Sequence, residues 1–164
     1  MTEKLDIPSI SAVIATASVV AGVIYYSIHI RLQTKVRQTD LVWRLYSDAN
    51  SKQHHDAWIK IMNSKFENYD DLVEKHGQLF SGKPIPDAFL IVANFYEGVG
   101  VLLHRKLVDI DMIVDLLPTE MTWEKVKPAV EGMRKRFNEP RFYEWFEYLY
   151  NEVKKEKNKN TKSQ

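Results

Sequence analysis

The stretch ISAVIATASVVAGVIYYSIHI, residues 10–30, contains no Asp, Glu, Lys or Arg. A helix of 21 residues is about 31 Å long, which matches the roughly 30 Å hydrocarbon core of a bilayer. Tyr25, Tyr26 and His29 lie near its end, where amphipathic rings settle at a membrane interface. We therefore predict a transmembrane helix over residues 10–30, in contact with the lipid bilayer.

Cleavable signal peptides and buried core helices are apolar as well, but both differ from this stretch. A signal peptide would have a basic start and a shorter apolar region that ends in small residues. Here the start is MTEKLD, and apolar residues run well past the small residues 15–17. A core helix would normally carry a polar face, whereas this stretch has only hydroxyls and one histidine. A membrane span fits the sequence better than either of them.

The charges beside the span predict its orientation. Only Lys4 precedes it, whereas four basic residues follow closely: Arg31, Lys35, Arg37 and Arg44. Lys and Arg concentrate on the cytoplasmic side of a span. We therefore expect residues 1–9 to be a short extracytoplasmic N-terminus at the cell membrane and the C-terminal domain to be cytoplasmic. Residues 31–48 hold no helix breaker, so the helix should continue as a juxtamembrane stalk.

Small residues line one face of the predicted span. Six residues at alternating spacings of four and three share that face: Ser11, Ala15, Ser18, Gly22, Tyr25 and His29. Small side chains let two membrane helices approach closely, which predicts a homodimer formed through Ser11, Ala15, Ser18 and Gly22. The alternative is that small residues are simply common in membrane spans.

Residues 49–153 have the pattern of a compact helical domain. Apolar residues at helical spacing, with proline and glycine as breakers, predict helices at about 54–66, 69–78, 88–106, 109–117, 120–137 and 139–157. Pro128 predicts a kink or an early boundary in the fifth of these. No hairpin signal or sustained alternation occurs. We therefore predict an all-α fold, with the membrane helix and stalk followed by a bundle of about five to six helices.

The charge is divided unevenly along the chain, although its net value is only +1. Residues 38–153 hold 14 Lys/Arg against 19 Asp/Glu, which argues against a nucleic-acid partner. Residues 154–164 are Lys-rich and predict a mobile tail, which either contacts anionic lipid or serves solubility. The absence of cysteine removes disulfides, thiolate metal sites and cysteine nucleophiles.

The stretch NFYEGVGVLLHRKLVDIDMIVDLL, residues 94–117, raises the possibility of chemistry because an acid, two glycines and a histidine follow one another. Gly98 and Gly100 lie inside a predicted helix, however, and not before one, so they match a dinucleotide-binding loop only weakly. No histidine has the spacing of a di-iron site, and His54-His55-Asp56 fits a polar helix start better than a metal site. We assign no catalytic, cofactor-binding or metal-binding residue.

Three segments carry a resemblance to a known family: residues 94–117, TWEKVKPAVEGMRKRF and FYEWFEYLYNEV. Over residues 40–153 the chain resembles a family of small prokaryotic single-pass membrane proteins with a helical cytoplasmic domain of unknown function. The resemblance brings no reaction, cofactor or binding residue with it.

The resemblance sharpens one structural expectation. A buried carboxylate is costly unless it is paired or protonated. We expect Glu97 to pair with a cation of a later helix, namely Arg134, with Trp123 or Asn94 nearby. With His104, these residues form the candidate polar site.

Two functions remain open. The first is a membrane-anchored scaffolding module that binds protein partners at the cytoplasmic face. The second is a membrane-tethered small-ligand sensor or enzyme with a pocket around Glu97, Tyr96 and His104. A deep polar cavity with an unpaired Glu97 would favour the second, whereas a closed interface filled by aromatic side chains would favour the first: Phe95, Trp123 and Trp145.

Overall fold

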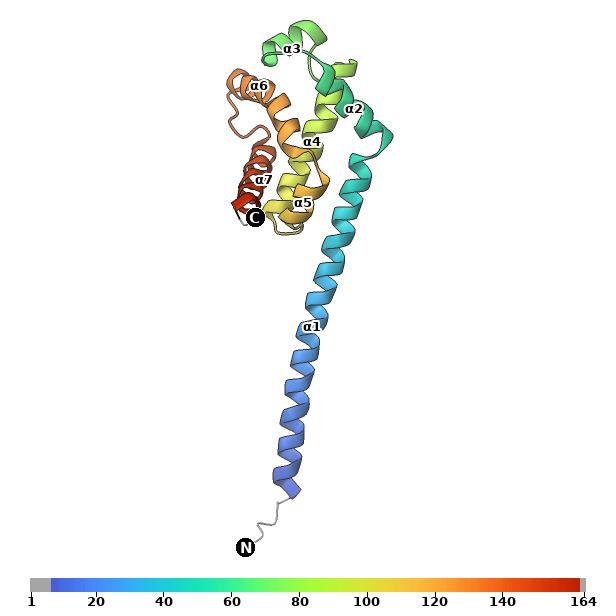
Figure 1. Ribbon diagram of the computed structural model, residues 1–164, viewed down its shortest axis with the longest axis vertical. Helices are drawn as coiled ribbons and strands as arrows, with labels where there is room; N and C mark the ends of the chain where they lie inside the picture. The colour runs from blue at the N-terminus through green and yellow to red at the C-terminus, as the bar shows by residue number, and fades with distance from the viewer. Residues whose placement is uncertain (1–6, 163–164) are drawn as a thin grey trace. The chain divides into compact units, whose positions relative to one another are not determined.

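The computed structural model describes residues 7–162 and divides the chain into two units, residues 1–39 and 40–164. The described residues form seven helices and no strand. These are α1 (Ile7–Ala49), α2 (Lys52–Asn63), α3 (Tyr69–His76), α4 (Pro84–His104), α5 (Ile110–Leu116), α6 (Thr119–Phe137) and α7 (Glu144–Lys162) (Figure 1). The predicted all-α fold with a bundle of about five to six helices is confirmed.

The first unit is the N-terminal part of α1, which runs through residues 10–30 and the predicted stalk without a break. The N-terminal residues 1–6 of the predicted extracytoplasmic segment lie outside the described residues. Large apolar side chains along this part are exposed, as in Val13 (67%), Val19 (66%) and Ile24 (55%). Between residues 10 and 39, the part of the first unit whose side chains are described, the apolar side chains are therefore exposed and form no core.

Three hydroxyl groups in this part of α1 are satisfied by the helix itself. Those of Thr16, Ser18 and Ser27 each donate to the carbonyl oxygen four residues earlier, at 2.7–2.8 Å. His29 and Gln33 pair through their side chains at 2.9 Å. Such local bonds remove much of the polarity that these side chains would present outside the helix.

The second unit is a bundle built around α4. Helix α4 packs most extensively on α7 and α2, while α3 packs on α6 and α5 on α7. Pro84 and Pro86 open α4 at a position where a missing N–H costs nothing. Its apolar residues surround it almost completely, and those facing the core include Phe89, Val92, Ala93, Tyr96 and Val99. This explains why α4, like α1, is long and apolar enough to cross a membrane by length and composition.

The end of α1 belongs to this second unit. Val42 is buried in the core, with Leu41 and Leu45 partly buried beside it. The stalk residues Leu32 and Val36, in the first unit, are instead exposed. The last part of the predicted stalk, from residue 40 onward, thus packs within the second unit.

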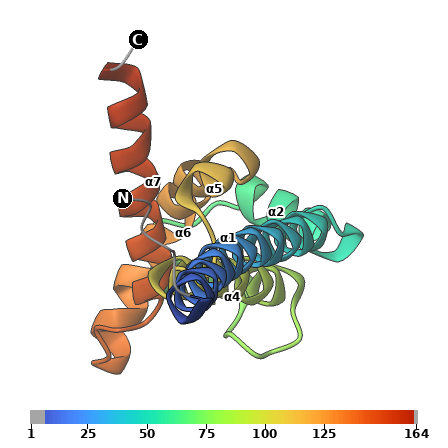
Figure 2. The same cartoon turned by 90° about the horizontal axis from the view of Figure 1, so that it is seen from below.

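Helices α2 to α6 keep their expected bounds within a few residues, and α7 differs most. Helix α6 runs through Pro128 without an early end. Helix α7 begins at Glu144, later than the expected 139, and continues to Lys162 through the Lys-rich segment. Its end projects from the bundle (Figure 2), although Lys157 still pairs with Glu120 of α6 at 2.5 Å. Ion pairs three residues apart also occur there, such as Lys155–Glu152 at 2.6 Å. Residues 163 and 164 of the predicted tail lie outside the described residues.

Candidate functional site

Glu97 does not form the expected ion pair with Arg134. Its Oε2 accepts a hydrogen bond from the Phe146 backbone N–H at 2.7 Å, and the Trp145 N–H also favours its ionised form. Both donors lie in the first turn of α7, where N–H groups have no partner within their own helix. Glu97 therefore caps α7 from α4, and the prediction of a cationic partner was wrong.

Arg134 instead bonds to Glu147 and to the backbone of Phe142. Its Nη1 lies 2.6 Å from a Glu147 carboxylate oxygen, and its Nε donates to the Phe142 carbonyl oxygen at 2.9 Å. The guanidinium thus holds the segment before α7 and the first turns of α7 itself. Arg134 and Glu97 act on the same helix start, but through different atoms.

Burial raises the pKa of the Glu97 carboxyl above its ordinary value, and the two N–H groups of α7 oppose this shift. The nearby Glu144 carboxylate raises the pKa of Glu97 further, while Arg134 lowers it slightly. Burial thus disfavours the ionised form of the Glu97 carboxyl, whereas the N–H groups at the start of α7 favour it.

Asn94 stabilises the same region one turn before Glu97. Its Oδ1 accepts a hydrogen bond from the Tyr143 hydroxyl at 3.2 Å. Tyr143 has a φ of +53°, in the left-handed region that bulky residues avoid. The bond to Asn94 and the edge-on packing of Phe89 at 6.0 Å hold Tyr143 in this conformation, from which α7 begins.

Trp123 and His104 have packing roles. Trp123 is buried, and its ring lies 4.9 Å from the ring of Phe146. His104 is exposed at the end of α4, and its ring packs at a tilt against the ring of Trp145 at 4.3 Å. The structure thus brings Glu97, Asn94, Trp123 and Arg134 around the start of α7, and His104 packs on Trp145 of its first turn and on Tyr148.

The pocket expected around Glu97, Tyr96 and His104 does not form as one space. Glu97 and Asn94 line an open hollow of about 490 Å³ with Glu139, Arg141 and Glu144. Tyr96 is buried in the core, stacked on Phe146 at 4.7 Å, and its pKa is raised by burial to about 12. The three side chains therefore do not converge on a single ligand.

The His54-His55-Asp56 sequence does not assemble into a metal site. His54 is buried with its ring edge-on to Phe95 at 4.5 Å. Asp56 is bound by Lys52, 2.5 Å away. The described residues contain no group of three His, Asp or Glu side chains arranged to hold a metal ion.

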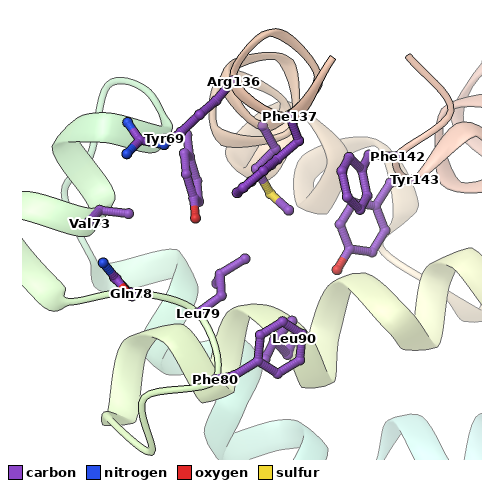
Figure 3. Close-up of a pocket in the computed structure, with 11 residues that line it drawn as sticks. Tyr69, Val73, Gln78, Leu79, Phe80, Leu90, Arg136, Phe137, Phe142 and Tyr143 are labelled. Atoms are coloured by element: carbon purple, nitrogen blue, oxygen red, sulfur yellow. The ribbon is translucent and has the colours of Figure 1, made fainter. Parts of the chain in front are cut away.

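A more enclosed cavity lies elsewhere in the domain, between α3, the following loop, α4, α6 and the segment before α7. It measures about 410 Å³ (Figure 3). Its wall is mainly apolar and aromatic and consists of Tyr69, Val73, Gln78, Leu79, Phe80, Leu90, Met133, Arg136, Phe137, Phe142 and Tyr143. We call it the Tyr69 cavity. Its volume is within the range typical of small-molecule sites.

Sequence reasoning missed the Tyr69 cavity. Its wall comes from five separate segments, and each of them looks like an ordinary amphipathic helix or a loop. One signal was present in the loop FSGKPIP, where Phe80 stands beside glycine and proline with no helix to bury it. In the structure Phe80 is 84% exposed and has a φ of +62°.

The sequence matches a known protein family. A family model described as "Domain of unknown function (DUF4760)" matches residues 12–153. The chain belongs to this family. The match confirms the resemblance to a family of unknown function, and it extends beyond the expected residues 40–153 to include most of the apolar stretch. No curated protein and no solved structure matches the chain.

Proposed function

We infer that this DUF4760 protein is anchored in the cell membrane by residues 10–30 and acts as a protein-binding scaffold through its cytoplasmic helical domain. The carrying observation is the exposed apolar surface of the first unit, in which eleven large apolar or aromatic side chains between Ile10 and Ile30 are at least 40% exposed. Apolar surface of this extent is unfavourable in water and favourable in lipid.

The polar groups of the segment support the same proposal. A helix in lipid must satisfy its polar groups internally. The hydroxyls of Thr16, Ser18 and Ser27 do so through carbonyl oxygens of α1. The basic residues that follow the span favour a cytoplasmic domain.

The contacts of Trp123 and Glu97 in the candidate site support a role as a binding module. Trp123 fills the helix interface, and Glu97 is engaged by backbone N–H groups. Neither is arranged for a reaction. Exposed apolar side chains remain on the domain for partner contact, such as Leu107 and Met121.

Membrane extraction tests the anchor. The full chain, tagged at each end, should stay in the membrane fraction after alkaline extraction, with an intact N-terminus and a C-terminal tag accessible only from the cytoplasm. Replacing Val20 and Val23 by Lys should release it, because each central Lys costs about 2.5–3.5 kcal/mol of insertion free energy. The matched control is Leu32→Lys with Val36→Lys, outside the span. Recovery of the unaltered chain as a soluble or cleaved protein would overturn the proposal.

In-cell photo-crosslinking tests the scaffold. Crosslinking residues at Leu107 and Met121, about half exposed, should capture the same partner in the anchored chain and lose it in the Val20→Lys, Val23→Lys chain. Failure to capture any recurrent partner would contradict this part of the proposal while leaving the anchor standing.

The small-residue face of α1 remains a separate prediction. An added side chain at Gly22 would meet no atom within 4 Å in the single chain. Gly22→Leu should therefore disturb only contacts with a second copy and reduce energy transfer between labelled chains in a membrane. Val13→Leu, on another face, is the control. Equal transfer in wild type and Gly22→Leu would exclude a homodimer through this face.

A further inference from the structure

The Tyr69 cavity contains a polar group that the fold leaves without a protein partner. Tyr69 is only 5% exposed, and Gly132 fits against it so closely that a Cβ there would lie 2.7 Å from the Tyr69 Cβ. Its hydroxyl points into the cavity and has no hydrogen-bond partner among the described residues (Figure 3). The hydroxyl is accessible from the cavity, where it can exchange a hydrogen bond with a bound molecule.

The electrostatic character of the cavity favours an uncharged molecule. Arg136 is the one charged residue in its described wall, and the guanidinium is engaged by Asp70 at 2.7 Å. The adjoining hollow shares Phe80, Leu90, Phe142 and Tyr143 with the cavity, and there Arg141 is ion-paired with Glu144. An anion entering the cavity would therefore meet no unpaired cation.

The rim of the cavity exposes aromatic rings. Phe80 is 84% exposed, and its φ of +62° is unfavourable for a bulky residue. Phe137, across the opening, is 50% exposed (Figure 3). The apolar body of a bound molecule would cover both rings, and the burial of this apolar surface would favour binding.

We propose that the Tyr69 cavity binds a small uncharged molecule with an aromatic or short acyl body and one hydroxyl or amide group that hydrogen-bonds Tyr69. The ring walls bury the body, and Tyr69 selects the polar group. This site adjoins the start of α7 through Phe142 and Tyr143 but does not include Glu97, and it does not depend on the membrane anchor or on protein partners.

Fluorine NMR provides a direct test with the full chain in lipid nanodiscs. The probe is 3-(4-fluorophenyl)propan-1-ol, and empty nanodiscs correct for partition into lipid. The probe signal should broaden saturably with the protein beyond the empty-disc level. The matched anion 3-(4-fluorophenyl)propanoate should bind at least tenfold more weakly.

Two variants assign the binding to the cavity. Val73→Phe fills the space beside the Tyr69 hydroxyl and should weaken alcohol binding at least tenfold, whereas Ile59→Phe on α2 should not change it. Tyr69→Phe keeps the ring but removes the hydroxyl and should weaken alcohol binding about fivefold, with Tyr148→Phe as its control. Circular dichroism verifies that each variant is folded.

Three results would overturn the proposal. These are an absence of broadening beyond the empty-disc level, unchanged binding in folded Val73→Phe, and equal affinity for the alcohol and the carboxylate. Unchanged binding in Tyr69→Phe would remove the assigned hydrogen bond and with it the stated ligand chemistry.

Discussion

The Glu97 carboxylate on α4 accepts a hydrogen bond from the Phe146 backbone N–H of α7 at 2.7 Å, so that a side chain of one helix caps the N-terminus of another. Local N-caps come from the residue just before a helix. Here that position is occupied by Tyr143, whose hydroxyl bonds to Asn94 and whose φ is +53°. The cap and the Asn94 contact therefore tie α4 to α7 at the point where α7 begins.

Removal of this cap should destabilise the domain. We expect Glu97→Ala to lower the free energy of unfolding by about 1–2 kcal/mol, the usual effect of losing an N-cap, and Glu97→Gln to lower it less because its amide oxygen still accepts an N–H. Denaturant unfolding followed by tryptophan fluorescence measures both. Glu124→Ala, an exposed change on α6, should have little effect. Equal stability of Glu97→Ala and wild type would contradict the capping role.

The same carboxyl predicts a pH dependence. Burial raises the folded-state pKa of Glu97 above its ordinary value of 4.5, so the folded state holds its proton more tightly than the unfolded state. Wild type should therefore lose stability relative to Glu97→Gln as pH rises from about 4.5 through the raised pKa. Unfolding free energies of both proteins between pH 4 and 7 give this difference. A difference that grows in favour of wild type with rising pH would reverse the assigned sign.

The sequence alone predicts where the helices lie, but it does not predict the hydrogen-bond partner of Glu97. Helical spacing and proline positions located α2 to α6 within a few residues because these signals are local. The start of α7 was expected near 139, which would have placed Phe146 in the helix interior with its N–H already bonded. A start at Glu144 leaves that N–H free. The difference arises from the Tyr143 conformation, which depends on contacts with α4.

The Tyr69 cavity could not be predicted from the sequence, for a similar reason. Tyr69, Phe80 and Phe142 are separated in the chain, and periodicity assigns each to an ordinary helix face or loop. A cavity is the space that packed segments fail to fill, and no local pattern encodes such a space. The exposed position of Phe80 was the one local signal.

His54 predicts a second pH dependence of opposite sign. Burial lowers the pKa of its imidazole from 6.5, with Asp48 opposing and His55 adding to the shift. The folded state therefore favours the neutral ring, and stability should fall as pH drops from about 6.5 through the lowered pKa. His54→Leu should flatten the stability profile in this interval, whereas His55→Leu, on the exposed face of α2, should keep it. An unchanged profile in His54→Leu would contradict the assignment to His54.

The two glycines of the GVG sequence should respond oppositely to the same substitution. A Cβ on Gly100 would overlap the Trp145 carbonyl oxygen of α7, whereas one on Gly98 would meet no atom within 4 Å. Gly100→Ala should therefore lower the free energy of unfolding by about 1–3 kcal/mol, as overpacking does. Gly98→Ala should raise it by about 0.5–1 kcal/mol, because alanine favours a helix more than glycine. Each variant is the other's control in denaturant unfolding. Equal effects at both positions would show that Gly100 is not required for the approach of α4 to α7.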